Sequence, residues 1–147
     1  MSDEIEYRPS PSYVVSMWFR KILVPVDGSG LSMKAVDLAI DFAKRYGSNI
    51  TALYITPDQV ANEQAEEIKD KVLKKQNDSG IIINFKIRKI KFPESSIAKE
   101  IVDEVNDGLY DAVIIGAKGM SGSEEFPVGS VAAAVAILAP CTVILVR

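Results

Sequence analysis

The chain has 147 residues, of which 48% are hydrophobic and 25% are charged, and its net charge of −3 offers no basic field to nucleic acid or to an anionic membrane. This length predicts one domain with a single sizeable core. The sequence contains no histidine and one cysteine. It therefore excludes histidine-based catalytic triads, imidazole metal sites and an internal disulfide.

The first residues are polar and acidic, with Asp3, Glu4 and Glu6, and do not resemble a secretory signal. No stretch approaches the ~20 apolar residues that a membrane-spanning helix requires. We therefore expect a cytoplasmic protein with an N-terminal tail at residues 1–19 and one domain at residues 20–147. The aromatic pair Trp18 and Phe19 is expected to pack against the edge of the domain or against a partner.

Apolar runs and apolar residues at helical spacing alternate along the domain. The predicted strands are residues 22–26, 50–55, 81 to about 90, 112–115 and 142–146. The predicted helices carry their apolar faces at residues 31–42, 61–72, 97–105 and 131–138. Ser29 is the expected N-cap of the first helix, and Gly47, residues 77–80 and Gly108 are expected to end the first three helices.

The third predicted strand differs from the others because its side chains alternate between apolar and polar. Ile81, Ile83, Phe85 and Ile87 are expected on one face, and Asn84, Lys86 and Arg88 on the other. This pattern is typical of an edge strand with one face in water. Its basic residues are interpreted as a solvated face rather than as a surface for nucleic acid.

The whole order of elements is βαβαβαβαβ, with connections long enough for right-handed crossovers. We therefore predict an α/β fold with a doubly wound, five-stranded parallel sheet and helices on both faces. If the first and fourth strands lie at the centre, the strand order is 3-2-1-4-5. Ligands of such sheets bind beyond the carboxyl ends of the strands, where the strand order reverses.

Two strands end in loops whose residues suit the binding of a phosphate-bearing ligand. The first ends in Pro25-Val26-Asp27-Gly28-Ser29, and the fourth in Gly116-Ala117-Lys118-Gly119. Gly129-Ser130 then begins the fourth predicted helix, whose N-terminal N–H groups suit a phosphate. Taken alone, Asp27-Gly28-Ser29 is equally a turn with a helix N-cap, and the glycines are equally ordinary loop residues.

Together these loops resemble the universal stress protein family, in its nucleotide-binding branch. The family's ATP-binding motif reads Gly-x2-Gly-x9-Gly-Ser/Thr, and Gly116, Gly119, Gly129 and Ser130 match it at full spacing. Residues 22–29 and 139–146 resemble the family's first and last strands. The resemblance covers about residues 20–147 and implies the fold described above.

The resemblance also implies a site for ATP, together with Mg²⁺. Asp27 and the backbone of Pro25 and Val26 would contact the adenosine, and the main chain of Ile55 would meet the adenine ring. Gly116 and Lys118 would flank the ribose and phosphate. The remaining expected ligands of the phosphates are Gly119, Gly129, Ser130 and Val131.

The resemblance further implies a homodimer that pairs through residues 142–146 and acts as a nucleotide-dependent regulatory or stress-response protein. Two alternatives stay open: a slow Mg²⁺-dependent ATPase, and a dimeric interaction module with an empty nucleotide site. Catalytic residues are not assigned. Glu124 and Glu125, inside the nine-residue spacer of the motif, would bind Mg²⁺, weaken phosphate binding or simply face solvent.

Overall fold

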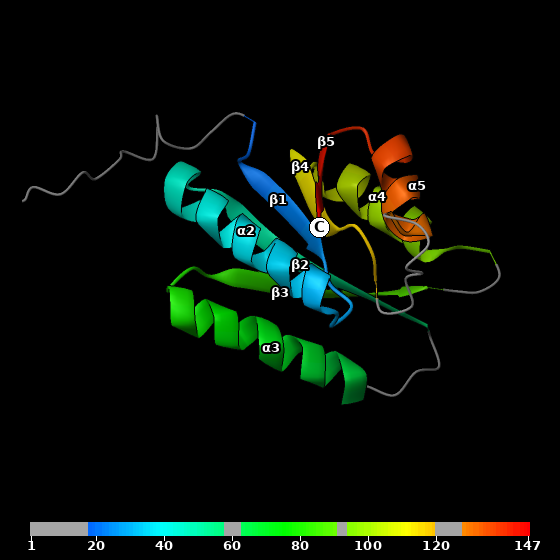
Figure 1. Ribbon diagram of the computed structural model, residues 1–147. Helices are drawn as coiled ribbons and strands as arrows, with labels where there is room; N and C mark the ends of the chain where they lie inside the picture. Colours follow the sequence, from blue (N-terminus) through cyan, green and yellow to red (C-terminus); the bar gives the residue numbers. More distant parts are fainter. Residues whose placement is uncertain (1–17, 58–62, 91–93, 120–127) are drawn as a thin grey trace, which may run out of the picture.

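The computed structural model describes residues 18–57, 63–90, 94–119 and 128–147, which form one sheet with helices on both of its faces (Figure 1). The strands are β1 (Lys21–Pro25), β2 (Asn49–Pro57), β3 (Ile83–Ile90), β4 (Ala112–Gly116) and β5 (Thr142–Val146). Their order is β3-β2-β1-β4-β5, and every neighbouring pair is parallel. The predicted fold class and strand order are confirmed.

Four helices connect the described strands. They are α2 (Gly30–Tyr46), α3 (Glu63–Ser79), α4 (Ile97–Gly108) and α5 (Ser130–Leu138). The sequence predicted the caps of α2, because the Ser29 hydroxyl accepts a hydrogen bond from the Ser32 N–H and Gly47 ends the helix at a φ of 71°. No helix in the described ranges is both long and apolar enough to cross a membrane.

The sheet separates two hydrophobic cores. Ile22, Val24 and Ile114 pack with α2 and α3 on one face, whereas Leu23 and Val113 pack with α4 and α5 on the other. Successive side chains of a strand point to opposite faces, so a strand buried on both faces is apolar at every position. This explains why the central strands β1 and β4 are continuous apolar runs.

Of the aromatic pair before β1, Phe19 packs against the edge of the domain, which is one of the two predicted outcomes for this pair. Phe19 lies against Phe42 and Tyr46 of α2, with ring centroids 4.9 and 5.8 Å apart. Trp18 is 74% exposed. The remainder of the predicted tail, residues 1–17, lies outside the described residues, as does Ala61 in the predicted start of α3.

The third strand differs from its prediction in two ways. It begins at Ile83 rather than at residue 81, because Gly80 turns the chain at a φ of 77° and the Gln76 side chain accepts the Ile83 N–H at 2.8 Å. The strand lies at the sheet edge, as predicted, but its polar face is not simply solvated. Arg88 donates to Glu100 and Glu104 of α4 at 2.7 and 2.8 Å.

Glu104 is the centre of this contact between β3 and α4. It is 1% exposed and also accepts hydrogen bonds from Lys86 and from the hydroxyl of Tyr110, at 2.9 and 3.0 Å. Burial alone would raise the pKa of Glu104, but its bonds to Lys86 and Arg88 outweigh that effect and hold the pKa below its usual value. These ion pairs join α4 to the edge of the sheet in addition to the apolar cluster that contains Ile90 of β3 and Ile101 of α4.

Candidate functional site

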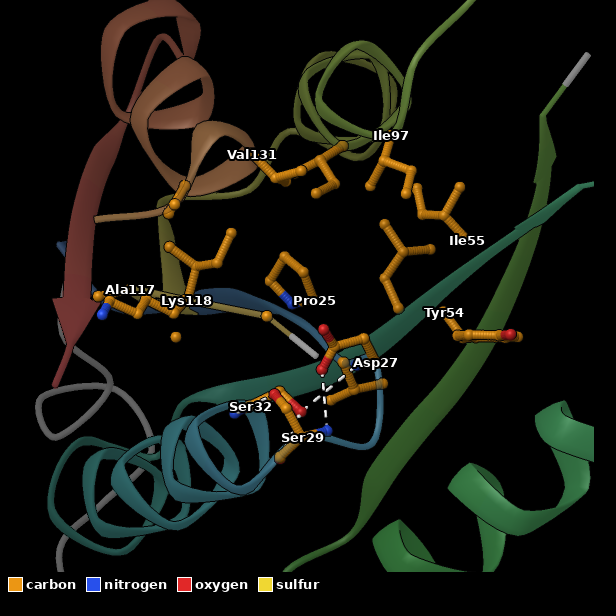
Figure 2. A pocket seen from close by; sticks show the side chains of 18 of the residues that line it. Pro25, Asp27, Ser29, Ser32, Tyr54, Ile55, Ile97, Ala117, Lys118 and Val131 are labelled. Atoms are coloured by element: carbon orange, nitrogen blue, oxygen red, sulfur yellow. Dashed lines mark hydrogen bonds between the residues drawn. The ribbon is translucent and has the colours of Figure 1, made fainter. Parts of the chain in front are cut away.

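A cavity of about 570 Å³ opens beyond the carboxyl ends of β1 and β4, where the strand order reverses (Figure 2). All ten predicted site residues line it: Pro25, Val26, Asp27, Ile55, Gly116, Lys118, Gly119, Gly129, Ser130 and Val131. The structure therefore brings the predicted set together in one place. What these residues bind stays a prediction.

The loop after β1 is a compact turn that fixes Asp27 at the cavity. The Ser29 N–H donates to Asp27 Oδ1 at 2.9 Å, while the Ser29 hydroxyl caps α2. Gly28 has a φ of 86°, which favours glycine, and its carbonyl accepts a hydrogen bond from Lys71 of α3 at 3.2 Å. The turn-and-cap interpretation of this segment is therefore correct, and the same turn places the carboxylate in the cavity wall.

The glycines after β4 have different roles. A Cβ atom added to Gly116 would lie 3.0 Å from the backbone of Leu31, so this glycine allows β4 to pack closely against the start of α2. A Cβ atom added to Gly119 would lie 2.6 Å from Asp27 Oδ2. Gly116 is thus required by the fold itself, whereas Gly119 brings the second loop against the Asp27 carboxylate.

The N-terminus of α5 also faces the cavity. Gly129 is its N-cap residue and supplies no side-chain cap, and the first backbone bond of the helix runs from the Ala133 N–H to the Gly129 carbonyl at 2.9 Å. The N–H groups of residues 130–132 precede that bond and have no partner within the helix. By contrast, α2 begins beside the same cavity but is capped by Ser29. Backbone N–H groups at the N-terminus of α5, rather than those of α2, could therefore donate hydrogen bonds to an anion in the cavity.

The fold already uses one backbone donor of Gly129. The Gly129 N–H donates to the Ala117 carbonyl at 2.6 Å, and whether this residue contacts a phosphate stays a prediction. Its φ of −74° is open to any residue, and an added Cβ would make only ordinary contacts, the nearest at 3.4 Å. The fold does not demand glycine here, because an added Cβ would meet only the backbone of Ala117 and Lys118 at ordinary contact distances.

The cavity has an apolar wall that the motif did not reveal. Ile97 and Ile101 of α4 and Val131 of α5 line it together with Ile55 of β2. Figure 2 shows Ile97 beside Ile55 at this part of the cavity. Ile97 is 42% exposed and was expected in the core of α4. Gln64, at the start of α3, adds an amide that no sequence signal singled out.

Charges are sparse in this cavity. Among the described residues that line it, only Asp27 and Lys118 carry a formal charge. Within those ranges no three histidine, cysteine, aspartate or glutamate side chains gather as a metal site. Glu124 and Glu125 lie outside the described residues, so their expected roles stay predictions.

Comparison with known proteins now decides the family. The model of the universal stress protein family matches residues 19–147. The chain belongs to the universal stress protein family. A universal stress protein of Methanocaldococcus jannaschii is 28% identical to it over 145 residues, which cover 88% of this chain and 82% of that protein.

Solved structures of this universal stress protein family share the fold. That of UspA from Lactobacillus plantarum has a TM-score of 0.77 and 26% identity, covering 90% of this chain and 100% of that one. A structure from Archaeoglobus fulgidus in complex with dAMP has a TM-score of 0.66 and 21% identity, covering 89% and 100%. One from Arabidopsis thaliana with AMP bound has a TM-score of 0.63 and 16% identity, covering 86% and 90%. At these lower identities the likeness is one of fold.

Proposed function

We propose that this universal stress protein binds an adenine nucleotide in the cavity between β1 and β4 and acts as a nucleotide-dependent regulatory protein. The observation that carries the proposal is the arrangement of the cavity: an apolar slot at one side, and the α5 N-terminus without a side-chain cap at the other. Family members with the same fold contain AMP or dAMP. The apolar side of the cavity suits the base of a nucleotide, and the α5 N-terminus suits its phosphate.

The base would occupy the apolar side. Ile55, Ile97 and Ile101 line that side, and their burial against a planar ring would stabilise the complex. The main chain of Ile55, at the carboxyl end of β2, would meet the edge of the base, and Asp27 would accept a hydrogen bond from the ribose. The backbone of Pro25 and Val26 completes this wall.

The phosphate would lie at the glycine loop and at α5. Backbone N–H groups and a positive helix terminus favour an anion there, and the Ser130 hydroxyl and the Lys118 ammonium would add donors. ATP with Mg²⁺ was the sequence expectation, and ATP and AMP share the adenosine group. Mg²⁺ bound together with ATP would neutralise part of the phosphate charge.

We also propose a homodimer that pairs through β5. This strand forms one edge of the sheet, and three of its five residues are half-buried apolar side chains. Next to it, Ile137 and Leu138 of α5 are 80% and 60% exposed. An apolar edge of this kind is a template for pairing, and a second copy would cover it.

Titration of the purified full chain with adenosine and AMP tests the nucleotide proposal. We expect saturable binding by calorimetry and a rise in the melting temperature with ligand concentration. Guanosine serves as the control for non-specific stacking. The absence of both heat and thermal shift with adenosine and AMP would contradict the proposal and would favour the empty interaction module.

A further inference from the structure

Arg88 is not among the described residues that line the cavity, but it is the neighbour of one that does. In the pairing of β3 with β2 it is the register partner of Ile55, which lines the apolar side. The Arg88 side chain extends to α4, where Nε donates to Glu100 Oε1 at 2.7 Å and Nη1 donates to Glu104 Oε1 at 2.8 Å. One guanidinium group therefore connects the strands that hold Ile55 to a helix that lines the same side of the cavity.

Glu100 ties the first turn of α4 to this guanidinium group. Along the helix it lies between Ile97 and Ile101, and both isoleucines line the cavity. Its Oε2 accepts a hydrogen bond from the Ser95 hydroxyl at 2.6 Å, so the residues that enter the helix are bonded to the same carboxylate. Ile101 is buried in the core cluster, whereas Ile97 is 42% exposed. Core packing thus restrains Ile97 less than Ile101, and the bonds of Glu100 matter more for its position.

The ion pair between Arg88 and Glu100 has the properties that such a restraint requires. The two side chains are 23% and 13% exposed, so water screens the pair less than it screens a pair on the surface. Hydrogen bonds between a planar guanidinium and a carboxylate are also directional. The fork of Arg88 reaches carboxylates on two neighbouring turns of α4, which the single ammonium of a lysine does less well.

We propose, on the basis of the proposed nucleotide site, that Arg88 is a positioning residue for the base: through Glu100 it sets the separation between Ile55 and the first turn of α4. Arg88 acts on the ligand only through this separation. A gap of about 0.5–1 Å already forfeits about a quarter to a half of a van der Waals contact. A small displacement of Ile97 is therefore enough to weaken its contact with the ring.

A double-mutant cycle with Arg88→Met and Ile97→Ala tests this inference. The full chain is titrated with adenosine by calorimetry, at a temperature at which every variant is fully folded. Adenosine carries no charge, so the lost charge of Arg88 has no direct effect on the ligand. We expect Arg88→Met to weaken adenosine by about threefold to tenfold alone, but by about twofold or less in the Ile97→Ala background, where the contact to be misplaced is already absent.

The cycle separates positioning from a loss of stability. A fall in the folded fraction would weaken adenosine by the same factor in both backgrounds. Equal effects of Arg88→Met in the two backgrounds would therefore overturn the inference, and so would no effect in either. If Arg88→Met does not fold, Glu100→Gln takes its place in the cycle with the same expected result, because it removes the charge that holds the guanidinium group.

Lys86→Met is the matched control. Lys86 lies on the same strand and donates to Glu104 at 2.9 Å, about one helical turn beyond Glu100. Its loss should leave adenosine affinity unchanged, and weakening equal to that of Arg88→Met would overturn the inference. A wild-type chain that does not bind adenosine defeats the proposed function together with this inference, whereas wild-type binding that Arg88→Met leaves unchanged defeats the inference alone.

Discussion

At the scale of single residues, Gly116 and Gly129 belong to one motif, but replacing each by alanine is expected to change the stability of the protein by different amounts. Gly116→Ala places a Cβ atom 3.0 Å from the Leu31 backbone, which cannot withdraw without moving α2. We expect it to lower the free energy of unfolding by about 1–3 kcal/mol. Chemical denaturation measures this change.

Gly129→Ala is the matched variant. Its backbone conformation suits any residue, and the added Cβ makes an ordinary contact at 3.4 Å with the Ala117 carbonyl. We expect its stability to stay within about 0.5 kcal/mol of the wild type, whereas its affinity for AMP falls because the Cβ fills space beside the phosphate. Unchanged AMP affinity in Gly129→Ala would remove Gly129 from the site.

A third residue tests the apolar slot. Ile97→Ala removes three carbon atoms from the cavity wall, and Ile97 is already 42% exposed. We expect a small loss of stability but a decrease in adenosine affinity of about fivefold to thirtyfold, corresponding to about 1–2 kcal/mol of lost apolar contact. Leu109→Ala, at an 80% exposed position after the end of α4, is the control and should leave adenosine binding unchanged.

At the scale of elements, α4 is attached to the edge of the sheet partly by ion pairs, and this part of its attachment depends on pH. The pKa of Glu104 is lowered because the bonds from Lys86 and Arg88 outweigh burial, and that of Glu100 is lowered by bonds from Ser95 and Arg88. Lowered carboxyl pKa values contribute stability that is present above the unfolded value of about 4.3 and is lost as the pH falls below it.

Glu104→Gln should therefore lower the free energy of unfolding by about 1–3 kcal/mol at pH 7 and reduce its dependence on pH below about 4.3. Urea denaturation between about pH 3 and 7 measures both effects. Asp103→Asn is the control, because its partner Lys99 is an exposed neighbour on the same helix and the pair is largely screened. An equal loss of pH dependence in both variants would contradict a special role of Glu104.

The same elements show where prediction from sequence succeeds and fails. Periodicity placed the five strands to within two residues. The strand order and the set of ten lining residues also depended on the resemblance to the universal stress protein family. Alternation in β3 showed which side chains share a face, but not that α4 covers that face, so Arg88 was expected in water. Helical spacing likewise assigned Ile97 to the core, because it cannot tell which side chains of a first turn project beyond the sheet into a cavity.

The bond from Gly129 to Ala117 was also beyond the sequence. It joins the N-cap of α5 to the loop after β4, two segments whose spacing along the chain does not reveal that they are in contact. The motif fixed which residue types are present and how far apart they lie along the chain. It did not determine which N–H groups the fold itself already uses.

At the scale of the whole molecule, the two edges of the sheet differ. The β3 edge carries the exposed side chains of Lys86 and Lys89, which oppose pairing with another strand, whereas β5 is apolar and lies beside the exposed Ile137 of α5. Ile137→Glu should therefore shift the full chain from dimer to monomer in sedimentation measurements. The melting temperature of the monomer should stay unchanged by the substitution. A charge at the centre of an apolar contact is costly because it loses its water.

Ile82→Glu provides the matched control for the dimer. Ile82 is 76% exposed, close to the 80% of Ile137, but it precedes β3 at the opposite edge of the sheet. It should leave the oligomeric state unchanged over the same concentration range. A dimer that survives Ile137→Glu but dissociates in Ile82→Glu would place the contact at the β3 edge, and a wild-type chain that is monomeric at all concentrations would remove the dimer from the proposal.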